Sequence, residues 1–151
     1  MIKKIFIVLL FILVTSCGYE SIYAKKNLTK LTIEKIELSG NKKINKMIIS
    51  QIPITLENNN KILILDTQKK IESSSKNKAG DTMVFNLSII TNLTLKNDDK
   101  IFKSRVFSSD FSYNNISNKF DLEQYQKSIE KNLAKKISDE IFLFLVSIND
   151  N

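Results

Sequence analysis

The first apolar block of the chain is short and lies at its N-terminus. Two lysines precede the continuous apolar run 5–14, and small residues lead from that run to Cys17 and Gly18. Charged, apolar and small-residue parts in this order are typical of a signal peptide. The run is about half the length of ~20 residues that a membrane-spanning helix needs. Because the chain's one cysteine stands at the cleavage point, residues 14–17 are interpreted as a bacterial lipobox.

A lipobox predicts that residues 1–16 are removed and that lipid is attached to the sulfur and the new amino group of Cys17. One acyl chain binds a membrane only marginally, whereas several act as an effectively permanent anchor. An ordinary secretory signal with an incidental cysteine and an uncleaved helical anchor are the alternatives. Gly18 favours the outer membrane, since an aspartate there is the usual inner-membrane retention signal. Residues 17–30, which carry apolar side chains only singly, are predicted to be a lipidated tether.

Beyond the tether, the pattern predicts a strand, a helix and a second strand. Residues 31–38 mix apolar and polar positions like a strand, with a change of face or a bulge in the middle. Asn41 is a predicted helix cap, and Pro53 is expected to kink or end that helix near residues 50–52. Residues 57–60 are a predicted loop and 61–65 a strand that continues into 66–70. The predicted helix has these apolar residues on one side: Ile44, Met47, Ile48, Ile52 and Leu56.

Residues 73–80 have turn and loop chemistry, and the clearest strand of the chain, 82–95, follows them. Its alternation predicts one face in the core and one face in water. A hairpin turn is predicted at 96–100, and the return strand at 101–113 carries Phe107, Phe111 and Tyr113 on one face. The predicted core residues of the first strand are Met83, Phe85, Leu87, Ile89, Leu93 and Leu95, and its predicted wet residues are Asn86, Ser88, Asn92 and Thr94.

A long helix is predicted to follow a loop at 114–119. Asp121 and Gln124 are spaced as a capping box that opens it, and apolar residues then recur on one side to about residue 147. Its end, 141–146, is apolar all round, which favours packing in the core and against a partner. The apolar side consists of Leu122, Tyr125, Ile129, Leu133, Ile137, Ile141 and Ile148.

These elements predict an α+β sandwich over residues 31–148, with 149–151 as a tail. We expect a four-stranded, mainly antiparallel sheet with two helices packed on one face, in the order β-α-β-β-β-α.

Composition excludes several kinds of chemistry. The chain has no histidine, the commonest general base and zinc ligand, and its cysteine is assigned to lipid. Three glycines are too few for a phosphate-binding loop, and the carboxylates are scattered. We therefore expect no enzyme, no catalytic residues, no metal site and no cofactor other than the covalent lipid on Cys17.

The formal charge of +7 favours anionic partners such as lipid headgroups, lipopolysaccharide phosphates or nucleic acid. An exported lipoprotein does not meet nucleic acid, so that partner is dropped. The alternative explanation is the abundance of lysine, isoleucine and asparagine that an AT-rich genome produces.

The sequence resembles the lipopolysaccharide-assembly lipoprotein family (LptE) of alphaproteobacterial type. The similarity covers nearly the whole mature chain. It lies in the cysteine-glycine-aromatic start of residues 17–23, the long strand and charged turn that lead into 102–113, and the helix from Asp121. The resemblance implies a binding role inside a large outer-membrane β-barrel, the translocon protein LptD, together with contact to lipopolysaccharide itself. It implies a location at the periplasmic side of the outer membrane.

Candidate lipopolysaccharide contacts lie around the predicted hairpin. Lys96, Lys100, Lys103 and Arg105 offer positive charge for phosphates, and an arginine can hold a phosphate with two bonds. Routine solvation of a hairpin tip is the alternative for these four. The polar strand face suits a water-filled barrel interior or simply solvent. The alternative function is a free-standing periplasmic carrier of lipid or another small ligand, tethered to the outer membrane.

Overall fold

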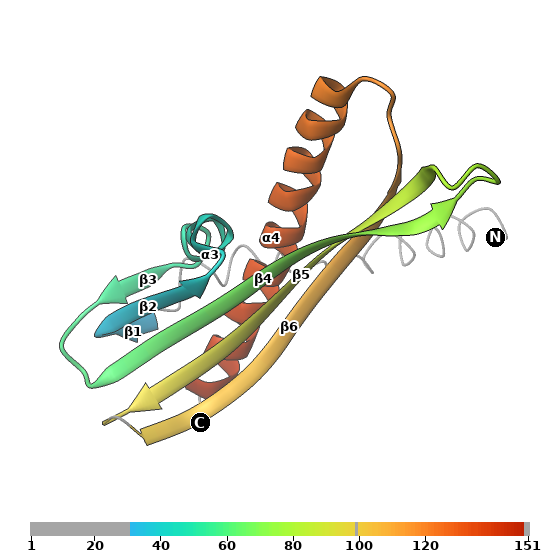
Figure 1. Cartoon of the computed structure of the whole chain (residues 1–151). Coiled ribbons are helices and arrows are strands. Elements are labelled where there is room, and N and C mark those ends of the chain that lie inside the picture. The colour runs from blue at the N-terminus through green and yellow to red at the C-terminus, as the bar shows by residue number, and fades with distance from the viewer. Residues whose placement is uncertain (1–30, 99, 150–151) are drawn as a thin grey trace, which may run out of the picture.

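The computed structural model of the chain describes residues 31–98 and 100–149, so the predicted signal peptide, Cys17 and the tether lie outside the described residues. The described part contains two sheets and two helices (Figure 1). In chain order the elements are β1 (Leu31–Ile33), β2 (Lys35–Gly40), α3 (Lys42–Ile49), β3 (Ile54–Leu56), β4 (Lys61–Lys76), β5 (Thr82–Asn97), β6 (Lys100–Asn114) and α4 (Lys119–Asn149).

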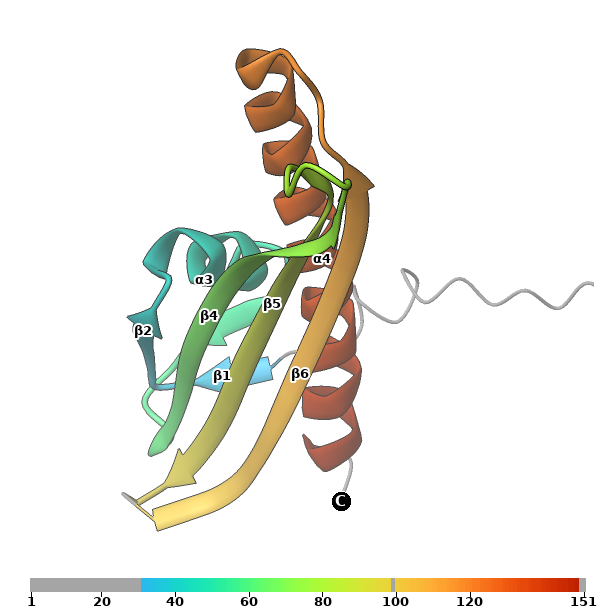
Figure 2. The same ribbon diagram turned by 45° about the vertical axis from the view of Figure 1, so that its right-hand side comes forward.

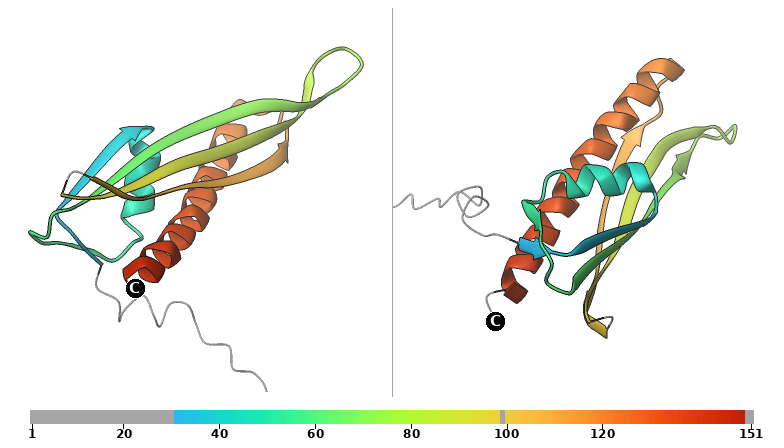
Figure 3. Two further views of the ribbon diagram at one scale, coloured as in Figure 1. Left: turned by 90° about the horizontal axis from the view of Figure 1, so that it is seen from below. Right: turned by 90° about the vertical axis from the view of Figure 1, so that its left-hand side faces the viewer.

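The main sheet has four strands in the order β2-β4-β5-β6. β4, β5 and β6 form an antiparallel meander, and β2 joins β4 in parallel. Both helices pack on the same face of this sheet (Figures 2 and 3). The predicted α+β class and its mainly antiparallel four-stranded sheet are therefore confirmed. The sequence did not predict the small second sheet, in which β1 pairs with β3 in parallel.

The change of face predicted within residues 31–38 is a break between two strands. Glu34 is a bend whose backbone N–H donates to Lys61 O at 2.8 Å. β1 then belongs to the small sheet and β2 to the large one. β2 ends at Gly40, where φ is +68° and a Cβ atom would collide with the backbone of Thr67. Glycine is required at this position because both the dihedral angle and the close approach exclude a side chain.

The first helix is shorter than predicted. Asn41 is its N-cap, as expected, and the Asn41 side chain accepts from Ile44 N at 3.1 Å. The helix ends at Ile49, before Pro53, so the prediction that Ile52 and Leu56 lie on it is wrong, although Ile52 is buried as expected. Leu56 stands in β3 with 64 % of its surface exposed. Proline cannot donate to the helix ladder, and the residues after it pair with β1 instead.

β4 is longer than predicted. It continues through residues 73–76, which were expected to form a turn, because their backbone pairs with β5 as far as Lys76 opposite Thr82. The turn itself occupies residues 77–81. There the Asn77 side chain accepts from Ala79 N and from Asp81 N, both at 2.9 Å. The turn prediction is therefore correct only for its second half.

The core lies between the large sheet and the two helices. The predicted inward face of β5 is confirmed from Phe85 to Leu95, while Met83, near the start of the strand, is 50 % exposed. The sequence did not predict Thr91, which is buried on the same face and shares a 2.8 Å hydrogen bond with Thr67. The large apolar side chains that are almost wholly buried are Ile44, Ile48, Leu63, Leu65, Leu87, Ile89, Leu93, Ile137, Ile141 and Phe142.

α4 begins two residues earlier than predicted, at Lys119. Its first N–H groups are bonded by Asn118, whose side chain accepts from Phe120 N at 3.0 Å, so Asp121 does not open the helix. The predicted apolar stripe is buried from Ile129 to Ile141, whereas Leu122 and Ile148 are partly buried and Tyr125 is 41 % exposed. The C-terminal turns are largely in the core. No helix of the described residues is long and apolar enough to cross a membrane.

Candidate functional site

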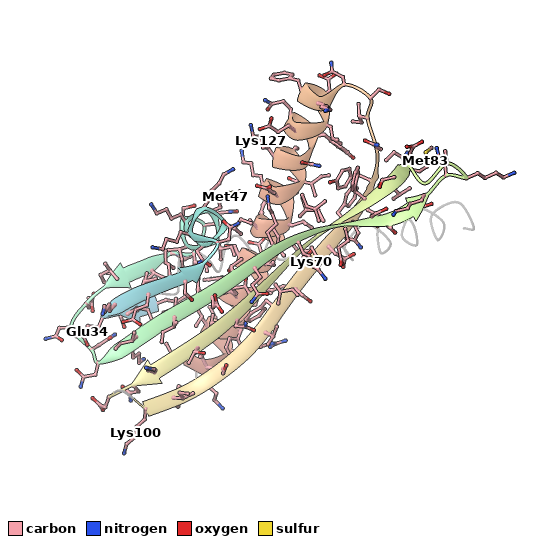
Figure 4. The ribbon with its side chains drawn as sticks, in the orientation of Figure 1. Glu34, Met47, Lys70, Met83, Lys100 and Lys127 are labelled. Atoms are coloured by element: carbon pink, nitrogen blue, oxygen red, sulfur yellow. The ribbon has the colours of Figure 1, made fainter. Side chains whose placement is uncertain are left out.

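The four predicted lipopolysaccharide-contact residues lie at one end of the large sheet, on and beside the β5–β6 hairpin. Figure 4 shows Lys100 at this end, far from Met83 at the other. A bulge at Phe102 shifts the register, so that Leu95 faces Lys103 while Lys96 faces Ile101. Side chains opposite each other in an antiparallel pair share a face. The register therefore places Lys100, Lys103 and Arg105 on the helix side of the sheet and Lys96 on the other side.

The guanidinium of Arg105 packs on two aromatic rings. Its Cζ lies 5.3 Å from the ring centroid of Phe107 on β6 and 5.3 Å from that of Phe144 on α4. These two rings meet edge to face at 5.8 Å. The contact joins the edge strand to the end of the long helix and holds the arginine in place by cation–π attraction. Lys103 lies less closely, 5.8 Å from the ring of Phe102.

None of these four cations forms an ion pair with any described residue. The ion pairs of the described chain lie elsewhere, on β2, β4 and the helices. Lys96 is partly buried, whereas Lys100, Lys103 and Arg105 are exposed. The hairpin end therefore carries four cations without a close ion pair to a described residue, in a stretch whose sequence also holds Asp98 and Asp99, and its net positive charge can attract an anionic group.

A pocket of about 240 Å³ opens beside this cluster. Its walls come from β1, the start of β4, the β5–β6 hairpin and the last turns of α4. Lys61 and Lys96 both border the pocket, but by the register only Lys61 is on the helix side, and the Lys96 side chain is on the opposite face of the sheet. The lining is otherwise mostly apolar and consists of Leu31, Thr32, Ile33, Leu95, Asn97, Phe102, Leu145 and Ile148. An apolar pocket next to free cations can accept one alkyl chain that carries an anionic group.

The opposite face of the large sheet is uncovered by any described element (Figure 3, right). The predicted wet residues Asn86, Ser88, Asn92 and Thr94 all lie on it and are partly exposed. Neighbouring strands add serines and Asp110, with Asn86 Nδ2 donating to Asp110 Oδ2 at 3.5 Å. Apolar side chains stand on the same face, among them Ile90 (40 % exposed), Val106 (61 % exposed) and Ile101 (68 % exposed). We call this surface the open face.

A buried ionic cluster ties both helices to the sheet. Glu130 on α4 accepts from Lys69 Nζ of β4 at 2.6 Å, and Lys43 Nζ of α3 lies 3.7 Å away. Next to it, Gln126 donates to the Tyr113 hydroxyl at 2.8 Å. Burial raises the pKa of Tyr113 above its usual value, partly offset by this hydrogen bond. The cluster faces neither the pocket nor the open face, so its role is structural.

Sequence reasoning missed both the pocket and the ionic cluster. The pocket joins residues up to 117 positions apart, from Leu31 to Ile148, and no local pattern reports such a meeting. Glu130 had a usable signal, because it stands three, four and seven positions before the buried Leu133, Ala134 and Ile137. Within residues 31–98 and 100–149, no group of three His, Cys, Asp or Glu side chains is placed to hold a metal ion.

Comparison with known proteins gave matches of fold only. No family model matches the chain, and no curated protein matches its sequence. Rare lipoprotein B from Shewanella oneidensis matches with a TM-score of 0.60 and 13% identity, over 78% of this chain and 97% of that one. A minor lipoprotein from Acinetobacter baumannii matches with a TM-score of 0.57 and 10% identity, over 79% and 95% of the two chains. Lipoprotein B from Nitrosomonas europaea matches at 0.56 and 12%, over 75% and 82%.

Proposed function

We propose that this chain is a non-catalytic lipoprotein subunit of the lipopolysaccharide translocon, held at the periplasmic side of the outer membrane by lipid on Cys17 and docked on the barrel protein LptD. The observation that carries the proposal is the fold, which matches nearly the whole length of rare lipoprotein B and of the Acinetobacter minor lipoprotein. The lipobox at the start of the sequence supports the same assignment independently.

The open face is the proposed docking surface. A domain whose helices cover only one side of its sheet leaves the other side available to a partner. Here the centre of that side is polar and uncharged at Asn86, Ser88, Asn92 and Thr94, and the ion pairs Lys70–Glu72 and Lys35–Glu37 lie toward its β4 and β2 side. The interior of a large outer-membrane barrel is polar as well. Contacts between two such surfaces are hydrogen-bonded and tolerate trapped water.

Detergent extraction of native outer membranes tests the docking. The wild-type protein is expected to co-purify with a large β-barrel. Charges placed on the open face by Ser88→Lys together with Asn92→Glu should spare folding and lower the amount of barrel recovered. Asn132→Lys with Lys136→Glu, on the exposed surface of α4, is the matched control and should leave recovery unchanged. A wild-type protein that extracts alone while barrels stay intact would contradict the proposal.

The anchor is tested separately. Cys17→Ala should leave the signal uncleaved or release the mature protein from the membrane, and palmitate labelling should disappear. Labelling that persists in this variant would assign the lipid to another residue.

Lipopolysaccharide contact is the second part of the proposal, and the free cations at the hairpin support it. Lys103→Glu with Arg105→Glu should weaken binding of purified lipopolysaccharide, and the loss should shrink as salt rises, since screening weakens surface charge interactions. Lys131→Glu with Lys136→Glu, both exposed on α4, makes the same charge change away from the hairpin. Equal weakening by both pairs would indicate an effect of net charge and not a site.

The pocket favours one alternative function, a lipid carrier. A carrier should bind a fluorescent lipid stoichiometrically without a barrel, and Phe102→Glu at the pocket should abolish that binding. Val106→Glu on the same strand is similarly exposed but lies outside the pocket and serves as the control. Binding that persists in the Phe102 variant would remove the pocket from consideration.

A further inference from the structure

β6 is an edge strand of unusual length. It has fifteen residues, lies at the end of the strand order, and no described strand pairs with its outer side (Figure 1). Twelve of those residues are exposed, among them Ile101, Phe102, Val106 and Phe111. Long edges of this kind present rows of unpaired backbone groups that attract another strand. The opposite edge, β2, has only six residues and carries the ion pair of Lys35 with Glu37.

The hydrogen-bond pattern identifies which backbone groups are free. Asn115 N donates to Met83 O at 2.8 Å, so these two residues form a hydrogen-bonded pair. In an antiparallel ladder such pairs alternate with pairs whose N–H and C=O groups point away from each other. Along the register of β5 and β6, the odd-numbered residues from Arg105 to Tyr113 therefore bond to β5. The even-numbered residues direct their N–H and C=O groups to the free edge, and these are Ser104, Val106, Ser108, Asp110 and Ser112.

The features that usually prevent a second strand from pairing with an edge strand are found at only one end of β6. The bulge at Phe102 protects the hairpin end, because it interrupts the regular edge there. From Val106 to Ser112 there is no proline, and the register of pairing with β5 is unbroken. Its four outward-facing residues offer four N–H and four C=O groups, so it can form up to about eight backbone hydrogen bonds with a second strand.

Charge argues against a second copy of this chain as the added strand. A symmetric antiparallel pair of β6 strands has its two-fold axis perpendicular to the sheet, so each face stays on its own side. The cations Lys100, Lys103 and Arg105 share the helix side, whereas Asp110 lies on the open face. In such a pair centred on Ser108, Arg105 and Lys103 of one copy would face Phe111 and Tyr113 of the other, so no β6 carboxylate would meet these cations. A partner strand with an acidic side chain opposite Lys103 or Arg105 complements this edge.

We propose that the 104–112 edge of β6 binds an extended segment of the barrel partner by strand addition, with an acidic residue of that segment placed against Lys103 and Arg105. This inference rests on the proposed function and names how the partner is held. Backbone hydrogen bonds supply the attachment and the cations set the register. The polar open face then lies beside the added strand as a continuation of the same contact.

Proline substitution tests the edge without altering the fold. Ser108 N points outward, so Ser108→Pro removes a donor that no described group uses, and proline is tolerated on edge strands. Ser108→Ala is the control that changes the side chain alone. In full-length, lipidated protein extracted from native membranes, we expect Ser108→Pro to recover at least about tenfold less barrel than wild type, while Ser108→Ala matches wild type.

Hydrogen exchange on the purified wild-type complex gives a second readout. The amides of Ser104, Val106, Ser108, Asp110 and Ser112 should exchange slowly in the complex and fast in the protein separated from its barrel. If the barrel co-purifies but these amides stay fast and Ser108→Pro retains it, the edge proposal is overturned and the proposed function stands. If no barrel co-purifies with the wild type, the proposed function fails and this inference fails with it.

Two further outcomes assign the edge to another occupant and overturn the proposal. Slow exchange of the edge amides in the protein freed of its barrel would mean that the chain covers its own edge. A disulfide between two copies of a Val106→Cys variant in intact membranes, at the wild-type expression level, would mean that β6 pairs with itself.

Discussion

Glu130 links α4 to both β4 and α3 by ion pairs, in addition to the apolar packing of the helix. Its side chain is 8% exposed, and its two oxygens lie 2.6 Å from Lys69 Nζ on β4 and 3.7 Å from Lys43 Nζ on α3. Glu130→Gln keeps the shape of the side chain and removes its charge. The variant leaves the Lys69 ammonium without an anion in a partly buried position.

The expected cost follows from how far Lys69 can reach water. Removing one partner of a fully buried ion pair costs about 3–5 kcal/mol, whereas exposed pairs contribute only about 0–1 kcal/mol. The Lys69 side chain is 31% exposed, between these limits. We therefore expect Glu130→Gln to lower the free energy of unfolding by about 1–3 kcal/mol. Lys43, at 68% exposed and 3.7 Å, should contribute a few tenths of a kcal/mol at most.

Urea unfolding of the mature chain with Cys17 replaced measures this cost. A double-mutant cycle of Glu130→Gln with Lys69→Met should give a coupling of about 1 kcal/mol, and the same cycle with Lys43→Met a value near zero. A loss below about 0.5 kcal/mol for Glu130→Gln, or equal coupling to the two lysines, would refute the reasoning.

Three further predictions concern stability. Asn41→Ala removes the cap acceptor of Ile44 N and should cost about 1 kcal/mol, while Asn41→Asp should not; equal losses would contradict the cap. Burial raises the pKa of Tyr113 in the folded state, so the folded protein favours the neutral phenol. The resulting contribution to the free energy of unfolding is present below the unfolded pKa of about 10 and is lost as the pH rises toward the higher folded value. Tyr113→Phe should reduce the loss of stability at alkaline pH, and identical profiles of unfolding free energy against pH for the variant and the wild type would argue against this role. Ile137→Ala should lower the free energy of unfolding by about 2–5 kcal/mol, and Leu143→Ala, at a half-exposed position, by under about 1 kcal/mol. The urea concentrations at the unfolding midpoints of the two variants would show this difference.

Regular alternation made some elements predictable. β5 was located and its faces were assigned correctly because apolar and polar residues alternate along it, and Asn41 was found because capping chemistry is local. The second half of β4, by contrast, has few apolar residues between Gln68 and Lys76. Cross-strand hydrogen bonds to β5 hold it extended, and a pattern based on burial does not report them.

The candidate site was predictable in composition but not in arrangement. Lys96, Lys100, Lys103 and Arg105 were expected near one hairpin end, and they lie there. Which face each one occupies depends on the single-residue bulge at Phe102, because one extra residue moves all later side chains to the other face. The contact of Arg105 with Phe144 joins residues 39 positions apart, which spacing along the chain does not indicate.

The most direct test of the account is photocrosslinking from the open face in the native outer membrane. A photoreactive residue replaces Asn92 in the full-length chain, and the same residue at Asn132 on the surface of α4 is the control. The account predicts that the Asn92 position forms a product containing a large outer-membrane β-barrel, identified by mass spectrometry, and that the control does not. A membrane-anchored protein that forms no barrel product at Asn92, or forms it equally at Asn132, would contradict the account.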